Sequence, residues 1–79
     1  MAKYRFHLVN GDISEAIAVE DLPDDLAAQR HAMDLGVKMF ASQPDVYRKE
    51  PWTVRVADAA GMVVHEAPVV EGELHALGS

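Results

Sequence analysis

Histidine is the residue type in this chain best suited to chemistry, because imidazole titrates near neutral pH and is a common metal ligand. The histidines are His7, His31, His65 and His75, and no two of them have the short paired spacing of a metal-binding motif. The chain has no cysteine, which excludes disulfides and thiolate metal sites. We therefore expect no metal site and no cofactor, and a structural or solvated role for each histidine.

Carboxylates gather in a second group, Glu20, Asp21, Asp24 and Asp25. Oxygen ligands of this kind suit Ca²⁺, but the group lacks the alternating aspartates, the glycine and the distal glutamate of a calcium loop. Pro23 lies among them, and proline followed by carboxylates is typical of a first helical turn, where negative charge offsets the helix dipole. The group is therefore expected to start a helix.

Catalytic motifs are missing from the sequence: there is no glycine-rich phosphate loop and no Gly-x-Ser-x-Gly elbow. We expect no catalytic residue and no enzyme activity. The net charge of −6 disfavours a protein whose whole surface binds nucleic acid or an anionic membrane. No stretch approaches the roughly 20 apolar residues of a membrane span. The start alternates charged and apolar residues and does not resemble a secretory signal, so a cytoplasmic location and no membrane partner are expected.

Two β-hairpins are predicted to flank one long helix. Residues 3–9 alternate apolar and charged, Asn10 and Gly11 suit a tight turn, and residues 13–20 return with Ile17 and Val19 inward. A helix is expected from residues 21–25 to about Gln43, ended by Pro44 and followed by a surface connection over residues 45–51. A second hairpin pairs residues 52–56 with residues 62–64 through a turn at 58–61.

The predicted fold is α+β, with an antiparallel four-stranded sheet in the order 2-1-3-4 and the helix on one face. The chain of 79 residues has room for one core, so residues 1–70 are expected to form a single domain and residues 71–79 a C-terminal tail.

Several short motifs resemble a family of small bacterial proteins known only as a domain of unknown function. They are Tyr4-Arg5-Phe6-His7, the turn Gly11-Asp12, Leu22-Pro23-Asp24 with Ala27-Ala28, and Trp52-Thr53-Val54-Arg55-Val56 with Asp58 and Gly61. The resemblance covers about residues 3–70. The chain departs from it at Ala16-Ile17-Ala18-Val19, where the family has a more acidic, glycine-containing stretch. The resemblance supports the fold and implies no activity.

One face of the predicted sheet is basic, and its residues are Lys3, Arg5, His7, Thr53 and Arg55. We interpret Lys3, Arg5, His7 and Arg55 as a candidate surface for an anion, an acidic protein or nucleic acid. Sheets that bind single-stranded RNA stack bases on exposed aromatic rings, whereas Tyr4, Phe6 and Trp52 are expected to point toward the core. A solvated face without a ligand is the alternative.

The helix carries two apolar stripes at helical spacing. Leu26, Met33, Val37 and Phe40 are expected to cover the sheet, and Ala28, Ala32, Leu35 and Met39 form a second stripe. The second stripe is interpreted as the interface of a homodimer. Alternatively, the C-terminal tail folds over this stripe and covers it with Leu74 and Leu77. The protein is thus expected to be a small binding or interaction module that forms a homodimer through this stripe. The alternative is a small nucleic-acid-associated regulator that uses the basic face.

Overall fold

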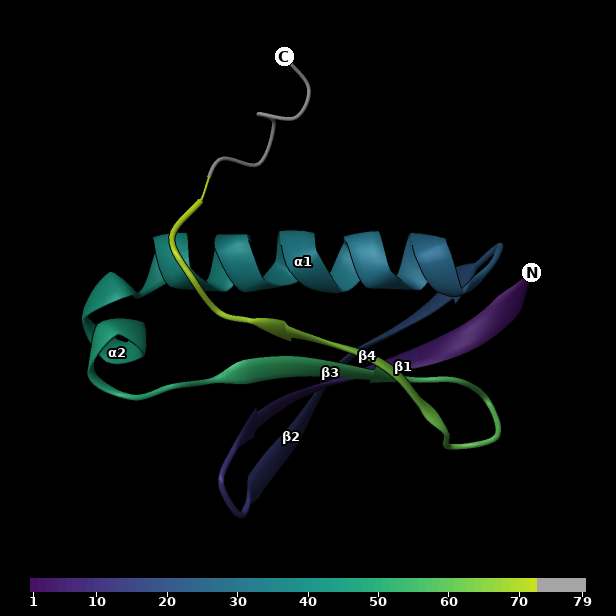
Figure 1. Ribbon diagram of the computed structural model, residues 1–79, viewed down its shortest axis with the longest axis horizontal. Helices are drawn as coiled ribbons and strands as arrows, with labels where there is room; N and C mark the ends of the chain where they lie inside the picture. The colour runs from purple at the N-terminus through teal and green to yellow at the C-terminus, as the bar shows by residue number, and fades with distance from the viewer. Residues whose placement is uncertain (73–79) are drawn as a thin grey trace.

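The computed structural model describes residues 1–72, and the chain forms one antiparallel sheet with a long helix on one side (Figure 1). The elements are β1 (Ala2–Asn10), β2 (Ile13–Leu22), α1 (Asp25–Ser42), α2 (Pro44–Lys49), β3 (Thr53–Ala57) and β4 (Val63–Pro68). The strand order is β2-β1-β3-β4. This confirms the predicted α+β class and the predicted order. Of the predicted tail, residues 73–79 lie outside the described part of the chain, and with them Leu74 and Leu77.

The first hairpin forms as its alternation predicts, but one extra residue changes the face of its second strand. Gly11 takes a φ of 58°, which the tight turn requires and which glycine adopts without strain. Phe6 pairs with Ala18 and His7 with Ala16, so Ile17 is a bulge. Val19 therefore pairs with Arg5 on the face away from the helix and is 55% exposed. Its predicted inward orientation is wrong, because a bulge shifts every later residue of a strand to the opposite face.

The boundaries of α1 follow from local capping chemistry. A side-chain oxygen of Asp24 accepts a hydrogen bond of 2.9 Å from the backbone N–H of Ala27, which satisfies one free donor of the first turn. Pro44 ends α1, but it also begins α2, where its missing N–H costs nothing at a first helical position. The surface connection expected over residues 45–51 is therefore partly helical. No helix within residues 1–72 is long and apolar enough to cross a membrane.

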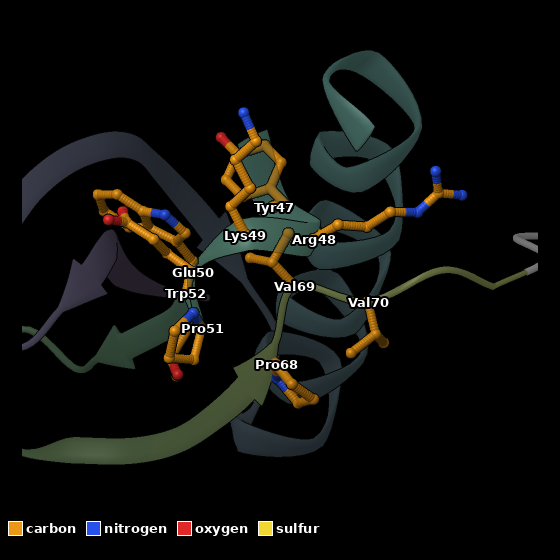
Figure 2. A pocket seen from close by; sticks show the side chains of 10 residues that line it. Tyr47, Arg48, Lys49, Glu50, Pro51, Trp52, Pro68, Val69 and Val70 are labelled. Carbon is orange, nitrogen blue, oxygen red and sulfur yellow. The ribbon is translucent and has the colours of Figure 1, made fainter. Parts of the chain in front are cut away.

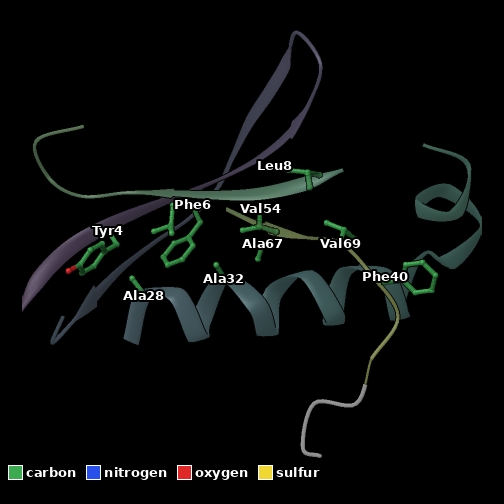
Figure 3. Packing of buried hydrophobic residues seen from close by; sticks show 10 residues of the cluster. Tyr4, Phe6, Leu8, Ala28, Ala32, Phe40, Val54, Ala67 and Val69 are labelled. Atoms are coloured by element: carbon green, nitrogen blue, oxygen red, sulfur yellow. The ribbon is translucent and has the colours of Figure 1, made fainter. Parts of the chain in front are cut away.

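The helix contacts the sheet through its smallest side chains, contrary to the sequence prediction. Ala28 and Ala32 are 0% exposed, and Leu35 and Met39 pack against the same cluster. These four residues, interpreted above as a homodimer interface, pack in or against the core of the monomer. Figure 3 shows Ala28 and Ala32 directed toward the sheet. Because Ala28 and Ala32 are already buried within the monomer, the assignment of this stripe to a homodimer interface is wrong. Of the stripe expected to cover the sheet, Phe40 is buried, whereas Leu26 and Met33 are 53% and 50% exposed.

Close approach of α1 to the sheet explains why small residues are selected at the contact. Ala28, Ala32 and Gly36 recur every fourth residue on one face of α1. Phe6 projects from β1 into the space above Ala28 and Ala32 (Figure 3). A Cβ added at Gly36 would lie 2.6 Å from the carbonyl oxygen of Pro68, well inside contact distance. The helix can pack this near β4 only because position 36 has no side chain.

The end of β4 contributes to the core beyond the second predicted hairpin. Ala67 pairs with Val54, and both are buried. The backbone N–H of Val69 donates a hydrogen bond of 3.0 Å to the carbonyl of Trp52, and the Val69 side chain is also buried. Trp52 itself packs against the core, as predicted from its alternation with Val54 and Val56, but part of its surface remains exposed.

A hydrogen bond between Tyr4 and Asp25 joins β1 to the first turn of α1. The Tyr4 hydroxyl donates to a carboxylate oxygen of Asp25 at 2.7 Å. This bond, together with burial, favours the protonated phenol and raises the pKa of Tyr4 from 10.0 to about 12. The stabilisation linked to this shift is complete below the unfolded-state pKa and is lost as the pH rises through the folded-state pKa.

We expect Tyr4→Phe to remove this alkaline sensitivity. The free energy of unfolding of the parent should fall between pH 10 and about 12 more steeply than that of the variant. Urea unfolding at several pH values measures both curves, and Tyr47→Phe provides a control at the other tyrosine. Parallel curves for the parent and Tyr4→Phe would contradict the role of the hydrogen bond.

Candidate functional site

Within residues 1–72, α1 lies on one face of the sheet and no helix covers the opposite face (Figure 1). Directly paired residues of an antiparallel sheet point to the same side, so the register gives the composition of this face. Three cross-strand rows run from β2 to β4: Val19, Arg5, Ala57 and Val63; Ala16, His7, Arg55 and Glu66; Ser14, Val9, Thr53 and Pro68. We call these rows, with the pair Lys3 and Asp21, the uncovered face.

The cations predicted for this face are all there, but most of them have acidic neighbours. Arg55 donates through Nε to a Glu66 carboxylate oxygen at 2.6 Å, and Lys3 is paired across the strands with Asp21. Arg5 is exposed and has only Val19 and Ala57 beside it in its row. No carboxylate within residues 1–72 lies at ion-pair distance from Arg5. Arg5 is thus the cation of this face with no carboxylate directly opposite it, and its exposed guanidinium can bind an anion.

Aromatic side chains are directed away from the uncovered face. Tyr4 and Phe6 are buried on the helix side of β1, as the alternation predicts. The residues directly across the strands from Arg5 are Val19 and Ala57, and its neighbours along β1 on this face are Lys3 and His7. A planar guanidinium with free donors can bind a carboxylate or phosphate in bidentate geometry. The uncovered face is therefore suited to contacts with anions and has no platform for stacking bases.

The histidines of the described residues lie apart from one another. His7 is on the uncovered face, His31 packs edge-on against the ring of Phe6 with centroids 5.0 Å apart, and His65 pairs with Val56 at the edge of the sheet. His75 lies outside the described residues. Within residues 1–72, no three histidine or carboxylate side chains meet as a metal site.

The acidic group before α1 is distributed among structural contacts. Asp24 caps the helix and Asp25 accepts from Tyr4. A carboxylate oxygen of Glu20 lies 3.9 Å from Nε2 of His31, across the gap between β2 and α1. Asp58 has a comparable role in the second turn, where its side chain accepts from the backbone N–H groups of Ala60 and Met62. These contacts support the capping interpretation of the sequence.

A pocket of about 420 Å³ lies where α2, the start of β3 and the end of β4 meet (Figure 2). The rings of Tyr47 and Trp52 pack edge-to-face with centroids 6.3 Å apart, and the valines after β4 lie beside them. Nε1 of Trp52 is buried and has no acceptor in the described residues. Because that donor is shielded from the pocket surface, it offers a ligand no contact. The sequence interpretation missed this pocket because it expected no helix after Pro44.

The comparisons with known proteins give a family and no activity. A family model described as a domain of unknown function, DUF6894, matches residues 3–70, which is most of the chain. The chain belongs to this family. The match covers all six elements of the DUF6894 fold apart from the first residue of β1, and it confirms the resemblance noted from the sequence. No curated protein and no solved structure matches the chain.

Proposed function

We propose that the protein is a non-enzymatic interaction module that binds an acidic segment of another protein through the uncovered face. The observation that carries the proposal is Arg5, an exposed guanidinium on the central strand β1, on a sheet face that no other element of residues 1–72 covers. Val19 and Val63 lie in the same row and are about half exposed, so apolar contact area flanks the charge. Arginine is among the residue types enriched at protein–protein interfaces.

An acidic protein segment fits this face better than nucleic acid does. Nucleic-acid affinity comes largely from several cations that neutralise phosphates, but Arg55 is already paired with Glu66 and Lys3 lies opposite Asp21. The rest of the molecule carries a net negative charge, which repels a polyanion at longer range. A short acidic segment needs only local complementarity, which Arg5 with His7 beside it can supply.

We expect Arg5→Glu to weaken binding of a glutamate-rich peptide by about tenfold, because it converts the central attraction of the face into repulsion. Arg30→Glu is the matched control, since Arg30 is an exposed arginine on α1 and makes the same change in net charge. Fluorescence anisotropy with the labelled peptide measures both affinities at low ionic strength. Equal affinities for the two variants would contradict the proposal.

A single-stranded oligonucleotide in the same assay separates the alternative function. If the parent binds the oligonucleotide more tightly than the peptide, with a steep fall in affinity as salt rises, the nucleic-acid role is favoured. Weak oligonucleotide binding that does not depend on Arg5 supports the protein partner.

A further inference from the structure

The outer edge of β2 is a second surface that the fold leaves open. β2 is the longest strand, with 10 residues, and within residues 1–72 its only neighbour is β1. Alternate residues of an edge strand direct their backbone N–H and C=O groups away from the neighbouring strand. The β1–β2 hairpin also bends away from α1 at its turn (Figure 1), so the helix reaches β2 only near its end.

The two edges of the sheet differ in how they are protected. β4 has 6 residues, ends at Pro68 and lies under α1, with a bulge at Val64. A short strand, a proline and a covering helix each block the addition of another strand. β2 has the bulge at Ile17 but none of the other three protections, and most of its residues are exposed on both faces. Strand addition is therefore open at β2 and closed at β4.

The charge along this edge selects the kind of strand that can be added. The β2 edge and its turn carry Asp12, Glu15, Glu20 and Asp21 and no lysine or arginine. Glu15 and Glu20 pair with Leu8 and Tyr4, so both point to the helix side of the sheet. Both are exposed, and a carboxylate oxygen of Glu20 also lies 3.9 Å from Nε2 of His31 on α1. Ala16 and Val19 point to the uncovered face. An added strand therefore meets Glu15 and Glu20 on the helix side, and Ala16 and Val19 on the uncovered face, where Asp21 follows near the end of β2.

Pairing with a second copy of this chain is disfavoured by the same charges. Consider two β2 strands that pair antiparallel about a two-fold axis at the middle of the strand, with the helix sides of both sheets on the same side. In this register Ala16 lies opposite Val19 of the other copy. Glu15 then lies opposite Glu20 of the other copy, on both sides of the two-fold axis. Like charges directly opposite one another destabilise a strand pair, and no basic residue of β2 relieves them.

We propose that β2 is a docking edge for an extended basic peptide segment of a partner protein, which adds to the sheet as a fifth strand. The backbone of the segment bonds to the free N–H and C=O groups of β2, as in other cases of β-strand addition. Its lysines or arginines alternate with apolar residues, so that the cations lie beside Glu15 and Glu20 and the apolar side chains beside Ala16 and Val19. This surface is separate from Arg5 and does not depend on the function proposed above.

The test uses a peptide of alternating lysine and valine, as long as β2, and the parent protein with residues 1–79. Amide hydrogen exchange is expected to slow at alternate residues of β2 on binding, because only the outward N–H groups gain a new acceptor. A version of the peptide with alternate backbone nitrogens methylated keeps the charges but cannot extend the ladder. We expect it to bind about tenfold more weakly.

Charge reversal tests the selectivity of the edge. Glu15→Lys with Glu20→Lys should weaken binding of the lysine–valine peptide by about tenfold, and should favour a glutamate–valine peptide instead. Asp34→Lys with Asp45→Lys changes the net charge equally at exposed helix positions and is the matched control. Urea midpoints of both double variants check that each remains folded.

Three results would overturn the proposal. The first is no binding of the lysine–valine peptide by the folded parent. The second is equal binding of the methylated peptide, which would mean charge attraction without strand addition. The third is protection of alternate β2 amides in the free protein that grows with its concentration, which would identify a second copy as the occupant of the edge.

Discussion

Ala32→Glu is expected to unfold the domain, whereas Met33→Glu, the same replacement one residue later, is expected to leave it folded. Ala32 is 0% exposed beneath the sheet, and Met33 is 50% exposed on the other side of α1. An unpaired carboxylate at position 32 would lose its hydration and displace Phe6, at a cost of several kcal/mol. Domains of this size have little stability in reserve, so this cost exceeds what the fold can absorb.

Circular dichroism and urea unfolding of the two variants provide the measurement. Met33→Glu should change the free energy of unfolding by no more than about 0.5 kcal/mol, the usual range for an exposed site. A folded Ala32→Glu together with an unfolded Met33→Glu would mean that the large apolar stripe covers the sheet, as the sequence alone suggested. The pair therefore distinguishes the two assignments of the helix face with one type of substitution.

The strands were predictable because one physical signal determined them. Tyr4, Phe6 and Leu8 alternate with polar residues, and a period of two residues is specific to a strand with one buried face. The face of α1 was not predictable in the same way. Both of its stripes are apolar, and ranking them by the size of their side chains favours Leu26 and Met33. The close approach that selects Ala28, Ala32 and Gly36 depends on other elements: Phe6 of β1 lies above the two alanines, and the carbonyl of Pro68 in β4 lies beside Gly36.

For the candidate surfaces too, features set by alternation within one strand were predictable, and features set by pairing between strands were not. Lys3, Arg5, His7 and Arg55 were assigned to one face from alternation alone, and the register places them there. The pairing of Arg55 with Glu66 was not predicted, because β4 was expected to end before Glu66. The bulge at Ile17 has no clear signal in the sequence, and it determines that Val19 lies beside Arg5.

Phe6→Ala is expected to destabilise the domain by about 3–5 kcal/mol, because it removes a large, fully buried side chain and leaves a cavity between the sheet and α1. Phe6 is central to the cluster: Ala28 and Ala32 face it from below, and His31 packs against the edge of its ring (Figure 3). The alanines that allow the helix to approach cannot fill the space left by the ring. The cavity should therefore persist.

Urea unfolding measures this effect, and Ile13→Ala is the matched control, since Ile13 is a large apolar residue that is 54% exposed at the end of β2. Ile13→Ala should cost less than about 1 kcal/mol, because little buried area is lost. Phe6→Leu provides an intermediate case that retains part of the volume and should keep the domain folded. A Phe6→Ala midpoint shifted no further than that of Ile13→Ala would show that α1 does not rest on Phe6. The small-residue contact of Ala28 and Ala32 would then need a different explanation, because those alanines are suited to the sheet only when a ring from β1 fills the gap above them.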